Sequence, residues 1–540
     1  MSKTETFSDI PVDINQGMPK HENLFALIKS LTKSEKRYFR LFASRHVIGE
    51  QNNYLRLFDA IYVQEHYDEV ALMRLFAGEK FIRHFPPMKD YLYNLILKSL
   101  RIFYSSSTID NQIRLLIHNI EILYHKILYK QCAKELLKAK QLAYKYQKNS
   151  YLIEIIEWEK RLLSRNLYDK SSEQNLDRIL KEEQSILEKI NDENKFWNFG
   201  KKIFLFRLKS PVIRSQQELQ HLENIFREVI FNENQKNLSY KARGLLYDAL
   251  ANYHYLKEGI QSKASYAYRK KIMELEEAHP EQTAVNVLNY VAGLYNFLLH
   301  SAYLRKYDAP FQKALEKLRM IPETYRGAKK NVIESINIRT FTSAYRVELS
   351  MYADTGEFEK GIKLIPDIEA GLVRYHKKLN HAIILDFYYF FSYFCFVTGD
   401  YTRSLYWLNK ILNDRVLDIR HDIHSFIRIF NLIVHFELGN IDLIEYAVRS
   451  TYRFLYTRQR LHKFESLILN FIRKKLPKVV DKNQLIDEFI ILKEEIKEII
   501  KDPYEKKVLE YFDFITWLDS KIEGKPLQEV LKKKNSGTLS

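Results

Sequence analysis

The chain has 540 residues and a formal net charge of +17, and 46% of its residues are hydrophobic and 28% charged. This balance is typical of a folded protein and excludes an intrinsically disordered one. Proline and glycine number only 12 and 15, too few for the many tight turns of a β-sandwich or an α/β protein of this length. We therefore predict an all-α fold of helices joined by short connections.

The start of the chain and its cysteines bear on its compartment. Residues 1–20 are polar and lack the apolar core of a signal peptide, so we predict a flexible leader there. Cys132 and Cys395 lie far apart and form no CxxC pair. This spacing excludes a disulfide scaffold and a thiolate zinc site, and it fits a reducing compartment. We expect a cytoplasmic protein.

Residues 21–110 are predicted to form a compact N-terminal helical module. Thr32 and Glu35 have the spacing of a capping box and precede the apolar residues of a helix. Further helical segments are expected at NYLRLFDAIYVQ (53–64), at DEVALMRLF (68–76) and after the break at Phe85–Pro87. The module has two interpretations: a cap for the helices that follow, or a helix-turn-helix unit that binds DNA.

A turn followed by an aromatic-rich helix recurs between residues 111 and 475. In TGDYTRSLYWLNK (398–410), Tyr401 and Ser404 follow Gly399 by two and five positions. Similar turns are centred at 127, 259, 309, 356 and 439. With the turn at 399 included, the five centres from 259 to 439 are 50, 47, 43 and 40 residues apart. The long gap between 127 and 259 predicts two further turns, near 171 and 215. Helical hairpins of this kind bury their apolar faces by stacking on their neighbours.

TGDYTRSLYWLNKIL resembles the junction between helix A and helix B of the tetratricopeptide repeat (TPR), and TGEFEKGIKLI is similar to it. Ser404 with Leu408, and Gly361 with Ile365, occupy the family's small and apolar positions in helix B. The repeat here is longer than the family's, which is about 34 residues, and the small residue late in helix A is not kept. The resemblance implies a TPR-like α-α solenoid over residues 111–475, a right-handed superhelix of antiparallel helix pairs.

In a TPR-like array the inner, concave face comes from helix A, so the resemblance implies a partner-binding surface there. A groove lined by tyrosine and scattered polar groups suits an extended or helical peptide. Core packing is the alternative interpretation for each tyrosine. Counting back from the turns places these residues on that face: Tyr253, Asn296, Tyr303, Arg346, Ser350, Asp386, Tyr389 and Tyr393.

The most apolar run of the chain is residues 382–397. It is 16 residues long and contains Asp386, whereas a membrane-spanning helix needs about 20 apolar residues. We predict a buried helix and no membrane insertion.

Residues 449–478 form a basic patch with a single acidic residue, Glu465. Arginines at helical spacing with tyrosine between them can contact phosphates and stack on bases. The patch has three interpretations: a solvated outer face, a nucleic-acid or ribosome contact, or a contact with an acidic protein segment. Its basic residues are Arg449, Arg453, Arg458, Arg460, Lys463, Arg473, Lys474, Lys475 and Lys478.

Residues 476–525 are predicted to form two helices, separated at Pro503, that close the far end of the array. Residues 526–540 are polar and are predicted to be a flexible tail.

The sequence contains no GxxxxGK[ST], GxGxxG or GxSxG motif. His421 and His424 have metal-like spacing but no evident third ligand. We therefore expect no catalytic residues, no cofactor and no metal. The favoured hypothesis is a non-enzymatic scaffold or adaptor that binds a protein or peptide partner. The alternative is a regulatory protein associated with nucleic acid or the ribosome through the patch at 449–478.

Overall fold

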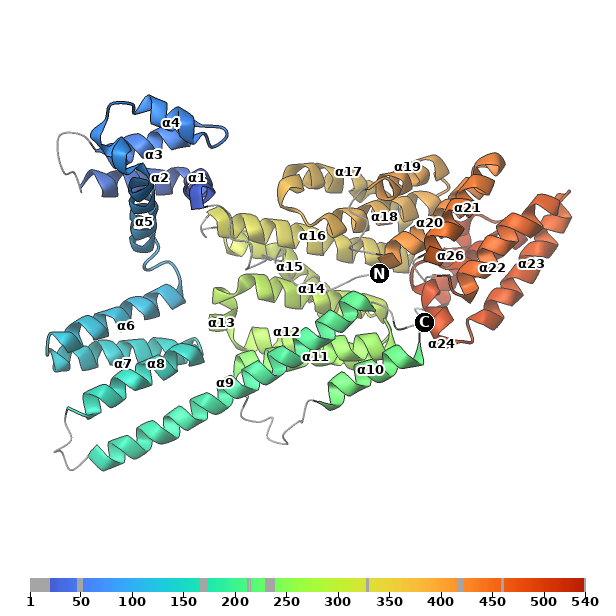
Figure 1. Cartoon of the computed structure of the whole chain (residues 1–540). Coiled ribbons are helices and arrows are strands. Elements are labelled where there is room, and N and C mark those ends of the chain that lie inside the picture. Colours follow the sequence, from blue (N-terminus) through green and yellow to red (C-terminus); the bar gives the residue numbers. More distant parts are fainter. Residues whose placement is uncertain are drawn as a thin grey trace. The chain divides into compact units, whose positions relative to one another are not determined.

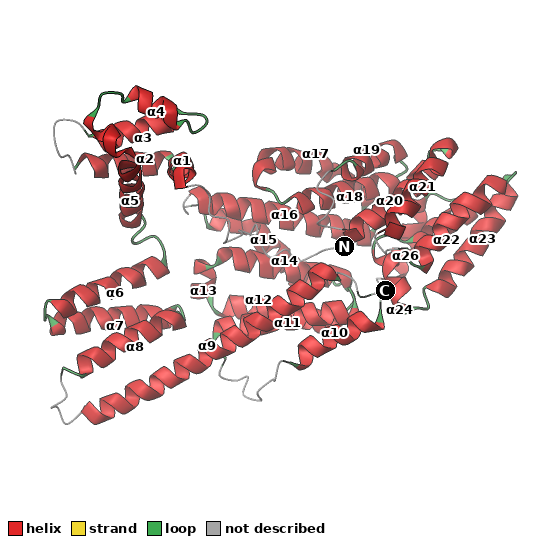
Figure 2. Cartoon of the chain, viewed as in Figure 1, coloured by secondary structure: helices red, strands yellow, loops and turns green. Residues whose placement is uncertain are grey.

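The computed structural model describes residues 20–45, 52–165, 172–210, 213, 215–228, 238–326, 330–414, 421–457 and 461–538. The predicted leader at 1–20 lies outside this part of the chain except for its last residue, which begins the first helix. Every regular element in the described residues is a helix and none is a strand (Figure 2). The prediction of an all-α fold is confirmed.

The chain divides into two compact units, one ending at Glu188 and the other beginning at Lys189. The division falls inside α9 (Ser172–Lys209), a single helix of 38 residues. The predicted boundary after residue 110 therefore lies within the first unit.

The first unit begins with a small core of its own, formed by buried side chains between Leu24 and Ile96. The predicted capping box is present: the Thr32 hydroxyl accepts a hydrogen bond from the Glu35 N–H, and the Glu35 carboxylate accepts one from the Thr32 N–H at 2.6 Å. The helices of this unit are α1 (Lys20–Ser30), α2 (Lys33–Ser44), α3 (Asn53–Val63), α4 (Glu69–Leu75), α5 (Phe85–Phe103), α6 (Ile109–His125), α7 (Tyr129–Lys145) and α8 (Asn149–Leu163), with a 3-10 turn at Lys80–His84.

The second unit consists of helical hairpins that follow one another along the chain (Figure 1). After the C-terminal part of α9, the helices of this unit are α10 (Gln216–Arg227), α11 (Tyr240–Glu258), α12 (Lys263–Ala278), α13 (Pro280–Val285), α14 (Val287–Tyr303), α15 (Ala309–Thr324), α16 (Lys330–Thr355), α17 (Phe358–Tyr375), α18 (His381–Val397), α19 (Tyr401–Leu412), α20 (His421–Glu437), α21 (Ile441–Thr457), α22 (Lys463–Asn470), α23 (Lys482–Ile499), α24 (Pro503–Lys506), α25 (Phe514–Glu523) and α26 (Leu527–Thr538).

The predicted turns coincide with backbone in the left-handed region. Gly259, Gly356, Gly399 and Gly439 have φ between +71° and +85°, and Ile127 has φ +62°. The remaining turn differs: its left-handed residue is Arg305, and residue 309 is already the first of α15. Each turn joins two helices that pack on each other, such as α18 with α19 and α20 with α21.

The turn expected near 171 lies outside the described residues, between the end of α8 at Leu163 and the start of α9 at Ser172. The turn expected near 215 falls between α9 and α10. The expected hairpin between them is absent, because residues 172–209 form the one long helix α9. This segment has no proline, and its only glycine, Gly200, lies within the helix.

Small residues allow neighbouring helices to approach closely, both between successive hairpins and within one hairpin. A Cβ atom at Gly361 of α17 would lie 2.1 Å from the Phe394 ring of α18. At the Gly399 turn, the Ser404 and Ser392 hydroxyls are 2.9 Å apart and wholly buried. In the hairpin at Gly259, the repeat pattern predicts a buried small residue five positions after the glycine, at Ala264. The small residue that is fully buried there is Ser265, one position later.

The C-terminal region differs from the two helices and flexible tail that the sequence predicts. α23 ends at Ile499, a short helical segment follows Pro503, and α25 begins at Phe514. The predicted tail contains α26, because Leu527 and Leu531, one turn apart, are buried in the core. The run at 382–397 is the buried helix α18, and no helix in the described residues is long and apolar enough to cross a membrane.

Candidate partner-binding groove

The residues that the TPR resemblance placed on an accessible inner face are mostly buried. Asn296 and Tyr393 are half-buried. The other six have relative exposures of 9% or less: Tyr253, Tyr303, Arg346, Ser350, Asp386 and Tyr389. Their role as partner contacts stays a prediction, and their burial in this conformation favours the alternative of packing.

Arg346 and Asp386 form a buried ion pair between α16 and α18, with Nη2 2.5 Å from Oδ2. The Arg346 guanidinium also lies over the Tyr295 ring of α14, 5.3 Å from its centroid. The pair therefore links three successive hairpins. Arg346 and Asp386, which were predicted to contact a partner, bind each other within the protein instead.

A second polar pair, which the sequence analysis missed, lies between α16 and the turn before α15. The Tyr307 hydroxyl donates a hydrogen bond of 2.7 Å to Asp354. Burial raises the pKa of Asp354 to about 6, although the hydrogen bond from Tyr307 opposes this shift. No sequence signal pairs the two residues, which are 47 positions apart.

The predicted inner face of α18 and α20 is covered by the chain's own residues 511–517. Tyr389 of α18 donates its hydroxyl hydrogen bond to the backbone carbonyl of Tyr511. The Tyr511 ring stacks on Phe426 of α20, with centroids 5.2 Å apart. Phe512 packs edge-on against Phe396, 5.6 Å away. One of the predicted contact residues, Tyr389, is therefore covered by a segment of the same chain.

α25 is fixed to the end of α20 by Trp517. The indole N–H donates a hydrogen bond of 2.7 Å to Glu437, and the same carboxylate pairs with Lys521. The Trp517 ring packs edge-on against Phe436. Together with burial, Glu437 raises the pKa of Tyr401 to about 12.

α26 lies on the turn between α16 and α17 and on the start of α25. Glu359 accepts hydrogen bonds from Gln528 and, at 3.2 Å, from Lys532. Lys534 reaches Asp513, with Nζ 2.5 Å from Oδ2. We call this surface, formed by Gly356, Glu359, Asp513 and Thr516, the α26 groove.

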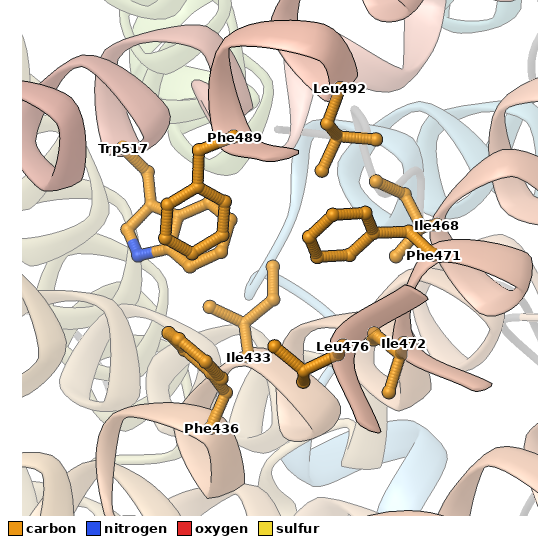
Figure 3. Close-up of a pocket in the computed structure, with 9 residues that line it drawn as sticks. All are labelled: Ile433, Phe436, Ile468, Phe471, Ile472, Leu476, Phe489, Leu492 and Trp517. Carbon is orange, nitrogen blue, oxygen red and sulfur yellow. The ribbon is translucent and has the colours of Figure 1, made fainter. Parts of the chain in front are cut away.

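A cavity of about 20 Å³ lies close to α25 (Figure 3). It adjoins the π-helical turn at Phe471–Lys475, and its lining surface is wholly apolar. A buried water needs two to four polar partners, so this cavity is a dry packing space and no ligand site. Its lining side chains are Ile433, Phe436, Ile468, Phe471, Ile472, Leu476, Phe489, Leu492 and Trp517.

A serine and a histidine meet inside the second unit. The Ser265 hydroxyl donates to the Ala251 carbonyl at 2.8 Å and lies 3.2 Å from Nδ1 of His300. Burial, with the charges of Arg269 and Arg207, holds the pKa of His300 well below its usual value. Both side chains are at most 3% exposed, so a substrate cannot reach them. We interpret the pair as a packing contact between α12 and α14.

The basic patch is partly neutralised by acids from outside 449–478. Arg449 pairs with Glu445, and Lys475 lies 3.5 Å from Glu488. The Glu505 carboxylate accepts the backbone N–H of Lys463 at 3.2 Å. Arg458 and Arg460 lie outside the described residues. The basic side chains of the patch that are exposed in the described residues are Arg449, Arg453, Lys463, Arg473, Lys474 and Lys478.

On α21, two tyrosines stand beside the arginines of the patch. The Tyr452 and Tyr456 rings are stacked 6.1 Å apart with an interplanar angle of 9°. Their exposures are 45% and 66%. Helical spacing predicts a tyrosine among the arginines of the patch, but it does not predict the parallel pair.

The described residues hold no cluster of three or more side chains able to bind a metal ion. His421 and His424 lie in the first turn of α20, and their side chains are outside the described set.

No protein-family model matches the chain, and no curated protein or solved structure is significantly similar to it.

Proposed function

We propose that this protein is a non-enzymatic scaffold whose TPR-like helical hairpins stack as a solenoid and bind a helical segment of another protein. The observation that carries the proposal is the way α16, α17, α18 and α20 hold residues 511–534 of the same chain. Phe426 and Phe396 pack against the rings of Tyr511 and Phe512. The Glu437 carboxylate accepts a hydrogen bond from the Trp517 indole, and the Glu359 carboxylate accepts one from the Lys532 ammonium. Recognition of an amphipathic helix in a groove uses the same combination of contacts.

The pattern of hairpin contacts supports the solenoid part of the proposal. α14 packs on α16 and α16 on α18, while α12 packs on α14 and α19 on α20. Contacts between first helices of successive pairs, and between a second helix and the next first helix, are what stacked hairpins require. A surface built this way needs no catalytic group, because its affinity comes from buried aromatic anchors.

Affinity capture with the full chain tests the proposal. The tagged protein is incubated with a lysate of its native host at moderate and high salt, with and without nuclease. We expect a discrete protein to be retained under all four conditions, because buried apolar contacts respond weakly to salt. Retention of no protein, or only of material that nuclease removes, would contradict the proposal.

A second candidate function, nucleic-acid binding, is favoured by one observation, the exposed parallel pair Tyr452–Tyr456 beside Arg449 and Arg453. Exposed aromatic rings give bases a stacking platform, and arginines neutralise phosphates. Anisotropy of a fluorescent single-stranded oligonucleotide across a salt series tests it. Binding that falls steeply with salt, and that is lost in Arg453→Glu and in Tyr452→Ala/Tyr456→Ala, is the expected result. Binding that survives both variants would exclude this face.

A further inference from the structure

α25 and α26 are held in very different ways. α25 buries Phe514, Trp517 and Leu518 in the main core, and Trp517 is hydrogen-bonded to Glu437. α26 inserts only two apolar side chains, Leu527 and Leu531.

The other contacts of α26 are polar: Asn535 is buried, whereas the ion pair of Lys532 with Glu359 is solvated. Lys532 and Glu359 are 45% and 60% exposed, and ion pairs of that kind add little stability in water. A helix of 12 residues is marginal on its own, so α26 owes its order to the groove.

The connection between the two helices suits independent movement. α25 ends at Glu523 and is capped by Gly524, which has φ +66°, and Lys525 and Pro526 precede Leu527, the first residue of α26. A left-handed glycine followed by proline ends one helix and prevents its continuation into the next. Release of α26 would break the contacts of Lys534 with Asp513 and Thr516, but it would leave the Trp517–Glu437 hydrogen bond that fixes α25 in place.

The α26 groove has a definite chemistry. Gly356 has no side chain, and the Lys532 Cγ lies 3.0 Å from the position that a Cβ would take there, so the helix lies directly against the turn. Glu359 and Asp513 give the groove two carboxylates that meet lysines of α26. In a chain of net charge +17, an acidic groove of this kind selects a basic helix.

We propose that the α26 groove is the docking site for an amphipathic helix of a partner protein, and that α26 occupies this site in cis until the partner displaces it. The partner helix carries two leucines one turn apart, as at 527 and 531, and lysines five and seven positions after the first leucine, as at 532 and 534. This inference rests on the proposed scaffold function and names its partner class.

The test uses the full chain with Leu531→Asp, which releases α26, and a fluorescent peptide of residues 525–538 as the probe. Because α26 occupies the wild-type groove, the apparent affinity for a competitor is the intrinsic affinity multiplied by the fraction of molecules whose groove is open. We expect the peptide to bind the Leu531→Asp protein about tenfold or more tightly than the wild type. A peptide that itself carries Leu531→Asp should bind at least about tenfold more weakly, since it loses a buried leucine.

Matched variants locate the contact. Adding Glu359→Lys to the opened protein should weaken peptide binding, and a peptide with Lys532→Glu should recover part of that loss. Lys533→Asp introduces the same acid on the exposed face of α26 and should leave the groove closed. If circular dichroism shows that Leu531→Asp loses helix beyond α26, the milder Leu527→Ala/Leu531→Ala protein replaces it.

Equal binding of the peptide to open and wild-type protein, or binding to neither, would overturn the proposal. Dimers of the wild-type protein that exchange α26 would assign the groove to a second copy and also overturn it. Peptide binding does not depend on lysate capture, so failure of the groove and failure of the scaffold function give different results.

Discussion

Tyr389 in α18 donates a hydrogen bond to the backbone carbonyl of Tyr511, 122 positions later in the chain. This contact joins the predicted inner face of the hairpins to the segment that covers it. Burial, with the neighbouring Tyr393, raises the pKa of Tyr389 far above its usual value, so its hydroxyl remains a donor.

Tyr389→Phe removes this hydrogen bond and keeps the ring. A typical intramolecular hydrogen bond contributes about 0.5–1.5 kcal/mol, and we expect a loss of that size in the free energy of unfolding, measured with urea. Amide exchange of residues 511–514 should also quicken. Tyr406→Phe, at a side chain that is 53% exposed, is the matched control and should change stability by less than about 0.5 kcal/mol. Equal effects of the two variants would count against the contact.

Gly361→Ala tests the close approach of α17 and α18. The added Cβ would lie 2.1 Å from the Phe394 ring, and overpacking of this kind costs about 1–3 kcal/mol. Gly244→Ala in α11 is the control, because nothing lies within 4 Å of its added Cβ. Alanine is the better helix former, so the control should gain about 0.5–1 kcal/mol. Urea unfolding of both variants should give opposite signs, and a neutral Gly361→Ala would show that the helices are further apart.

The buried pair Arg346–Asp386 predicts a non-additive response. Removing one partner leaves an uncompensated buried charge, so Arg346→Met and Asp386→Leu should each cost about 3–5 kcal/mol. The double variant should cost less than the sum of the two, because it leaves neither charge behind. A double-mutant cycle in urea measures this coupling, and strict additivity would place the two charges in solvent.

The carboxyl of Asp354 predicts a pH dependence with a definite sign. Its pKa is raised from 3.8 in the unfolded chain to about 6 in the folded one, so the folded state holds the proton more tightly. The stability that Asp354 contributes is complete below pH 3.8 and is lost as the pH rises to about 6. Asp354→Asn should therefore gain stability relative to wild type between pH 4 and pH 6. Urea midpoints across that range test this, and a constant difference would contradict it.

The sequence was most informative about local structure. Glycine favours left-handed backbone, so the turns at Gly356, Gly399 and Gly439 could be located, and Thr32 with Glu35 located a helix start. The left-handed residues Gln147 and Arg305 gave no such signal, because non-glycine side chains rarely adopt that conformation.

The candidate groove could be predicted only in part. Helical periodicity indicates that Tyr389 faces the hairpin interior, but it does not indicate which distant segment covers it. The contacts with Tyr511 and Trp517 depend on how residues 476–538 return over α18 and α20, which local pattern does not encode. The segment that forms α26 was predicted to be a polar tail, because its KKKN stretch is polar and only Leu527 and Leu531 supply apolar side chains to the buried face of the helix.

The most direct test of the account is quantitative affinity capture from host lysate with three samples. These are the wild-type chain, the Leu531→Asp chain, and the Leu531→Asp chain with an excess of the 525–538 peptide. We predict a protein that is enriched by Leu531→Asp over wild type and is lost when the peptide is added. Equal recovery in all three samples would show that partners bind elsewhere, and it would contradict the assignment of this groove.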